Sequence, residues 1–160
     1  MEGVPPNISV NMRTPLSVLT FEIPFFIFFL KLSGFSWILI ETAELILGES
    51  GENIGFVSIN ILENPDSLRK KVKQGISKVK NDNGVLILTD MFGGTPSNLS
   101  YSFLEEGKVE VISGVNLPIL LKAISSRKKM DMSTLTSSLI ENGKRSISLA
   151  SGILKGAKRA

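Results

Sequence analysis

The stretch from residue 84 to residue 98 constrains the fold of this chain more than any other. Within it, residues 85–88 form a continuous apolar run of strand length, which is typical of a strand covered on both faces by helices. Asp90 follows this run almost directly. We therefore expect a buried strand with a carboxylate at its carboxyl end, which is the end where open α/β sheets bind their ligands.

The residues after Asp90 predict a tight loop and the start of a helix. The pair Gly93 and Gly94 lets the backbone turn sharply and approach a ligand closely. Thr95 suits a helix N-cap, and Pro96 suits the first helical position. Free N–H groups at such a helix start favour anions, so the stretch predicts a phosphate-type site.

Apolar patterning in the rest of the chain alternates between strand and helix periods. The expected strands are residues 25–30, 56–61, 85–88, 109–112 and 146–150. The expected helices end near 48, begin at Asn64 and Pro65, run from Thr95 to near Gly107, begin at Asn116, and begin at Asp131 or Ser133. This alternation predicts an α/β fold with an open, mostly parallel sheet and helices on both faces.

Composition excludes several function classes. The 160 residues fit about one domain, and the formal charge of +3 comes from scattered lysines and arginines, which favours solvated helix faces over nucleic-acid binding. The chain has no cysteine, so disulfides, thiol nucleophiles and cysteinyl metal sites are excluded. It also has no histidine, which removes the usual general base, the commonest metal ligand and any phosphohistidine.

The first forty residues differ in character from the rest. Residues 1–14 are predicted to be disordered, and residues 16–40 are strongly apolar. Three interpretations of the apolar segment compete: a membrane helix, which Glu22, Pro24 and Lys31 interrupt; a secretory signal, which lacks a basic start; and a buried first strand followed by a helix. The expected organisation is an extension over 1–24, a domain over 25–150 and a basic tail over 151–160.

Three motifs carry a family resemblance. Residues 88–98, residues 113–118 and residues 41–48 resemble the signature elements of the mannose-family IIA domain of the bacterial sugar phosphotransferase system. The resemblance covers residues 41–150 and implies a flavodoxin-like sheet order. It also implies a homodimer in which the last strand joins the sheet of the partner.

The resemblance further implies a phosphoryl carrier. In the family, a histidine after the first strand receives a phosphoryl group from the phosphocarrier protein and passes it to a IIB domain. We accordingly expect these two partners, a cytoplasmic location in association with a membrane sugar permease, and neither a cofactor nor a metal.

The resemblance assigns roles to residues of the central stretch. Asp90 matches the aspartate that orients the histidine, Thr95 matches the hydroxyl that contacts the phosphoryl group, and Gly93 and Gly94 match the loop that holds it. The same residues also suit plain structural roles: a strand-end aspartate, an N-cap and a glycine turn. Asn116 either caps its helix or lines the pocket, whereas Met91 and Phe92 suit an apolar rim for partner docking.

The phosphorylated residue itself is missing. Counting back without gaps from residues 41–48 places the family's histidine near Leu32, where the sequence offers no imidazole. We hypothesise that a reading-frame change or a wrong start replaced the native N-terminal sequence, which leaves the chain as written inactive. The alternatives are a non-catalytic binding or regulatory module, a membrane-anchored domain, and a receiver-like domain phosphorylated on Asp90, which would need acidic Mg²⁺ ligands after the first strand.

Overall fold

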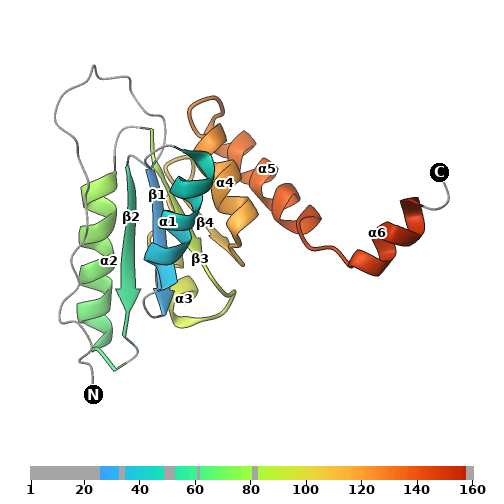
Figure 1. Cartoon of the computed structure of the whole chain (residues 1–160). Helices are drawn as coiled ribbons and strands as arrows, with labels where there is room; N and C mark the ends of the chain where they lie inside the picture. The colour runs from blue at the N-terminus through green and yellow to red at the C-terminus, as the bar shows by residue number, and fades with distance from the viewer. Residues whose placement is uncertain (1–25, 33–34, 49–52, 61, 81–82, 158–160) are drawn as a thin grey trace.

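Strands and helices alternate along the chain (Figure 1). The computed structural model describes residues 26–32, 35–48, 53–60, 62–80 and 83–157. The strands are β1 (Phe26–Leu32), β2 (Ile54–Ile59), β3 (Val85–Thr89) and β4 (Val109–Ser113). The helices are α1 (Phe35–Leu47), α2 (Pro65–Val79), α3 (Thr95–Tyr101), α4 (Leu117–Ser126), α5 (Met132–Arg145) and α6 (Ala150–Ala157).

The strands form a parallel sheet in the order β2-β1-β3-β4. In register, Leu30 of β1 pairs with Thr89 of β3, and Thr89 pairs with Ser113 of β4. The predicted α/β class with a parallel, flavodoxin-like sheet is confirmed. The strand predicted at 25–30 extends two residues further, to Leu32, and the one predicted at 56–61 begins earlier, at Ile54.

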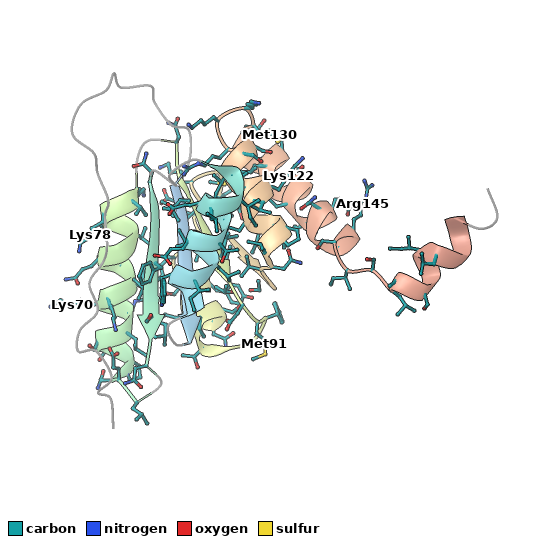
Figure 2. The ribbon with its side chains drawn as sticks, viewed as in Figure 1. Lys70, Lys78, Met91, Lys122, Met130 and Arg145 are labelled. Atoms are coloured by element: carbon teal, nitrogen blue, oxygen red, sulfur yellow. The ribbon has the colours of Figure 1, made fainter. Side chains whose placement is uncertain are left out.

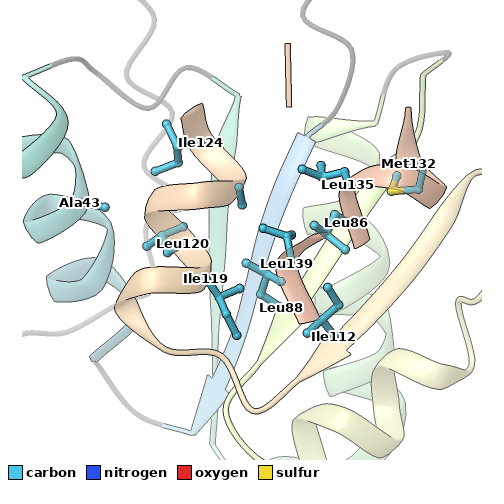
Figure 3. Packing of buried hydrophobic residues seen from close by; sticks show 11 residues of the cluster. Ala43, Leu86, Leu88, Ile112, Ile119, Leu120, Ile124, Met132, Leu135 and Leu139 are labelled. Atoms are coloured by element: carbon cyan, nitrogen blue, oxygen red, sulfur yellow. The ribbon is translucent and has the colours of Figure 1, made fainter. Parts of the chain in front are cut away.

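The core lies on both faces of β3, whose five residues are all buried. Leu86 and Leu88 point into a cluster with residues of α1, α4 and α5, which Figure 3 shows in close-up. Val85 and Ile87 point the opposite way, into a cluster with α2. The alternation of side chains along a strand thus explains why the apolar run is continuous rather than alternating.

Short polar side chains begin α2 and α5, as predicted. Asn64 caps α2 by accepting a hydrogen bond from the backbone N–H of Asp66 at 2.8 Å. Of the two candidates for the start of α5, Asp131 is the cap: its carboxylate accepts the backbone N–H and the hydroxyl of Thr134. These bonds satisfy N–H groups that have no partner within their own helix.

The strand predicted at 146–150 is wrong. The backbone N–H of Ser146 still bonds to carbonyls at the end of α5, residues 147–149 have no regular structure, and α6 begins at Ala150. Ile147 and Leu149 alternate as a strand would, but they are 80% and 74% exposed, because none of the strands that the structure describes pairs with them. An alternating pattern alone does not form a strand without a ladder of backbone partners. Figure 1 shows α6 projecting away from the body of the molecule.

The central helix is shorter than predicted and starts differently. It ends at Tyr101 rather than near Gly107, and Gly94 is its N-cap, so Thr95 is the first helical residue rather than the cap. Its last backbone bonds turn into a bend closed by the contact between Glu105 and Val109. The apolar residues after Tyr101 therefore belong to a turn that leads into β4.

The apolar N-terminal segment is described only in part. Residues 26–32 form the strand between β2 and β3, in the place that the buried-strand interpretation gave them. Residues 1–25, with the predicted disordered start and most of the extension, lie outside the described residues. Among the helices that the structure describes, none is both long and apolar enough to cross a membrane.

Candidate functional site

The candidate site lies where β1 and β3 end side by side. The chain proceeds from β1 outward to β2, and later from β3 outward to β4, so the strand order reverses between β1 and β3. Ligands of open α/β sheets bind in the crevice at such a switch point. The backbone of Leu32, the last residue of β1, and that of Asp90, directly after β3, come to this same edge.

Asp90 is half-buried at the top of β3. One carboxylate oxygen, Oδ1, accepts the backbone N–H of Met91 at 3.0 Å. This bond holds the side chain beside its own backbone at the sheet edge. A carboxylate has further acceptor positions beyond this one bond, so it can also orient a donor brought to it from the end of β1.

The glycine loop makes the turn from Asp90 into α3. Gly93 has φ +77°, a conformation that disfavours residues with a Cβ, and a Cβ there would meet no described atom within 4 Å. The loop is closed by two bonds: the N–H of Gly94 to the carbonyl of Met91 at 3.3 Å, and Nδ2 of Asn98 to the carbonyl of Gly93 at 3.1 Å. Thr95 follows as an exposed residue in the first turn of α3. The loop is thus open to solvent at Gly93 and Thr95.

Asn116 serves as a helix cap in this structure. Its Oδ1 accepts the N–H of Ile119 at 3.0 Å, which begins α4, and its Nδ2 donates to Oγ of Ser146 at 3.1 Å. The loop that carries it is tied to the site, because the N–H of Val115 donates to the carbonyl of Thr89 at 3.0 Å. The capping role is confirmed, and the pocket role stays a prediction.

Two large apolar side chains stand exposed on the loop. Met91 is 61% exposed and Phe92 is 79% exposed. Figure 2 shows Met91 at the margin of the molecule, beside the short helix α3. The ring of Phe92 lies 6.2 Å from that of Tyr101, centroid to centroid. This arrangement matches the predicted apolar rim, whose docking role is taken up below.

A set of buried and half-buried hydroxyls next to the loop was not singled out from the sequence. Oγ1 of Thr89 donates to Oγ of Ser113 at 2.8 Å, and Oγ of Ser97 lies 2.9 Å from the same atom. Ser97 also donates to the Tyr101 hydroxyl at 2.6 Å. The available signal was a polar residue at the end of each of two apolar strands, together with a Ser–Tyr pair at i, i+4. Within the described part of the chain, no group of three or more metal-ligating side chains is close enough to hold an ion.

This geometry can be compared with known proteins. The model of the family described as the PTS system fructose IIA component (EIIA-man) matches residues 35–140. The chain belongs to this family. It is a mannose-family IIA component of the sugar phosphotransferase system, and IIA components generally pass phosphate between the phosphocarrier protein and IIB.

Individual relatives agree with the family match. A fructose-specific EIIA component of Bacillus subtilis is 33% identical over 121 residues, which span 75% of this chain and 82% of that protein. A mannose-specific EIIAB component of Escherichia coli K12 is 38% identical over 90 residues, 56% of this chain but 28% of that longer protein.

Solved structures show the same fold. The PTS IIA protein associated with the fucose utilization operon of Streptococcus pneumoniae superposes with a TM-score of 0.70 at 25% identity, over 81% of this chain and 96% of that one. A mannose/sorbose-specific IIA subunit from Enterococcus faecalis gives a TM-score of 0.69 at 18% identity, over 78% and 92% of the two chains, which is a likeness of fold alone. The family match begins at residue 35, three residues after the position predicted for the histidine.

Proposed function

We propose that the crevice between the ends of β1 and β3 is the phosphoryl-relay site of this IIA component. The observation that carries the proposal is the position of Asp90, which directly follows β3 at the switch point of the sheet, beside the end of β1. A side chain placed at the end of β1 would face this carboxylate and the open glycine loop. A family histidine at that point would have a carboxylate to orient its ring and a loop to hold the phosphoryl group.

Each residue of the site then has a chemical role. Asp90 accepts a hydrogen bond from one imidazole nitrogen and so fixes the tautomer, which leaves the other nitrogen free to attack phosphorus as the bond to the donor breaks. The N–H groups of Gly93 and Gly94, with the Thr95 hydroxyl, hold the phosphoryl oxygens. Asn116 holds the neighbouring loop in place at the edge of the pocket. Met91 and Phe92 form the apolar rim on which the partners dock.

The chain as written lacks the residue that would carry the phosphoryl group. None of its 160 residues is histidine or cysteine. A serine or threonine would form a phosphate ester, a poor donor for onward transfer. The site therefore has the groups that would bind a phosphoryl group but no residue that would carry it, and we expect no relay activity from this sequence.

A relay assay tests the assignment. The chain and a variant carrying Lys31→Thr, Leu32→His and Ser33→Gly are incubated with labelled phosphoenolpyruvate, the first enzyme of the system and the phosphocarrier protein. We expect label only on the variant, in an adduct that is stable in base and labile in acid. Adding Asp90→Asn should slow labelling by roughly 100-fold. An unlabelled variant that binds the IIB partner would favour the non-catalytic module instead.

The assembly of the protein is part of the proposal. We infer a homodimer formed through the segment after Ser146, because Ile147, Leu149, Ile153 and Leu154 are all exposed in the single chain. Its proposed partners are the phosphocarrier protein and a IIB subunit, in the cytoplasm beside a membrane sugar permease. The proposed relay domain covers residues 25–150, between an N-terminal extension and a basic tail at 151–160.

The origin of the N-terminal sequence has its own test. We propose that a change of reading frame replaced the segment before residue 35, where the family match begins. The genomic DNA, sequenced and translated in all frames, should then encode a Thr-His-Gly segment in another frame just upstream. An unbroken frame with no such segment would contradict this origin.

A further inference from the structure

The hydroxyls of Thr89, Ser97, Tyr101 and Ser113 form one connected cluster, the hydroxyl network, beneath the glycine loop. It joins the end of β3 to the end of β4 and both to α3. Thr89 and Ser97 are 0% exposed. Buried hydroxyls are costly unless they are hydrogen-bonded, so their mutual bonds fix their relative positions.

Ser113 is the centre of the network. Its Oγ accepts from Thr89 at 2.8 Å, lies 2.9 Å from Oγ of Ser97, and lies 3.5 Å from the hydroxyl of Tyr101. Ser97 donates to Tyr101 at 2.6 Å. With Tyr101 donating to Ser113 and Ser113 donating to Ser97, each hydroxyl donates once, and no proton is without an acceptor. Such closed chains are stronger than isolated bonds because each bond polarises the next.

In the sequence, two residues of the hydroxyl network lie on either side of the site residues. Thr89 directly precedes Asp90, and Ser97 lies two residues after Thr95. The loop between these two anchors contains Asp90, both glycines and Thr95. Its two ends are therefore held to a common point, Ser113 of β4, rather than to each other alone.

We infer that the hydroxyl network positions Asp90 and Thr95 for phosphoryl relay, with Ser113 as the shared anchor. The inference rests on the proposed relay function of the loop. The four hydroxyl residues are positioning residues: they act by holding the loop against β4, and the groups that touch the phosphoryl are Thr95 and the loop N–H groups.

The test compares two serines that differ in their hydrogen-bond partners. Ser113→Ala removes the half-buried anchor of the network. Ser100→Ala removes a buried hydroxyl that, among the described residues, donates to the Pro96 carbonyl of its own helix at 2.7 Å. Amide exchange is measured at Gly94 and Asn98, whose N–H groups bond within the loop and the first turn of α3, with Ile87 as the core reference. We expect about tenfold faster loop exchange in Ser113→Ala, unchanged exchange at Ile87, and little change in Ser100→Ala.

A second pair of variants covers the case in which Ser113→Ala fails to fold. Thr89→Val removes the hydroxyl while keeping the shape, and Thr89→Ser keeps the hydroxyl. In the relay variant described above, which carries Lys31→Thr, Leu32→His and Ser33→Gly, Thr89→Val should lower the labelling rate about tenfold, and Thr89→Ser should restore it. Tyr101→Phe, which loses only the oxygen, should give an intermediate loss.

The outcomes separate the inference from the proposed function. Equal loop exchange in the Ser113→Ala and Ser100→Ala proteins would overturn the inference whether or not the relay works, and so would equal labelling rates of Thr89→Val and Thr89→Ser in an active relay variant. An inactive relay variant with the expected exchange pattern would contradict the relay function, while the loop would still be shown to be held by the network.

Discussion

At the scale of single residues, helix caps are the most regular feature of this chain. Asn64, Asn116 and Asp131 each begin a helix by accepting a backbone N–H through a side-chain oxygen. The cap at Asn64 could be predicted from the sequence, because a short polar side chain precedes proline and an apolar helical pattern. The sequence left two alternatives at the others: Asp131 or Ser133 as the helix start, and a cap or a pocket role for Asn116. Thr95 shows where this reasoning fails: it has a suitable side chain, but the preceding glycine already occupies the cap position.

The cap at Asp131 predicts a specific pH dependence of stability. Hydrogen bonds from the backbone N–H and the hydroxyl of Thr134 lower the pKa of its carboxyl below the ordinary value of 3.8. A pKa that is lower in the folded state adds stability above the unfolded-state value and loses it as the pH falls through the folded-state value.

Asp131→Asn keeps a side-chain oxygen that can cap the helix but removes the carboxyl group that titrates. Urea unfolding of both proteins, followed from about pH 6 down to about pH 2.5, should show the advantage of the native protein over the variant shrinking below about pH 4. Parallel stability curves for the two proteins over this range would contradict the assignment of the lowered pKa to the cap.

At the scale of elements, the packing of α4 on α5 depends on a residue without a side chain. A Cβ at Gly143 would lie 2.5 Å from Cδ1 and 2.8 Å from Cγ1 of Ile119, which is itself buried. No single-sequence pattern predicts this contact, since it depends on the distance between two helices that are brought together only by the fold. The ends of the strands show the same limit: the polar residues Thr89 and Ser113 meet because of the sheet register.

Gly143→Ala should therefore destabilise the protein. The overpacking cost of about 1–3 kcal/mol exceeds the gain in helix propensity of somewhat under about 1 kcal/mol. The matched control is Gly152→Ala in α6, where a Cβ would meet no described atom within 4 Å and the change should be neutral or slightly stabilising. Denaturant unfolding measures both effects.

A second substitution, at Ile119, tests whether the clash with this side chain causes the loss of stability. Ile119→Val removes the Cδ1 atom, so the double variant with Gly143→Ala should lose less stability than the two single changes added together. Simple additivity of the two changes would show that the clash is not the source of the effect.

At the scale of the whole molecule, the body of the domain differs from its C-terminal arm, residues 147–157, in how much apolar surface it buries. The sheet with its two layers buries both faces of β3, whereas Ile153 and Leu154 of α6 remain exposed. The α/β class and most elements could be predicted because periodicity within one chain determines them. The arm could not, because the residues at 146–150, which have a strand pattern, pair with none of the four described strands.

Removal of the arm should abolish dimer formation and leave the folding of the domain unchanged. Truncation after Ser146 removes no residue of either core cluster, so the melting temperature should change little under conditions in which both forms are monomeric. Light scattering coupled to size-exclusion chromatography should show a dimer for the full chain and a monomer for the truncated one. A truncated chain that remains dimeric would place the interface elsewhere.

The central claim is that the carboxylate of Asp90 faces the position at the end of β1 where the family carries its histidine. An NMR titration of the imidazole in Leu32→His, with and without Asp90→Asn, tests this most directly. A carboxylate within hydrogen-bond reach stabilises the imidazolium, so the pKa in Leu32→His should lie above the ordinary value of about 6.5 and should fall when Asp90 is replaced. The same imidazole pKa in both variants would contradict the account.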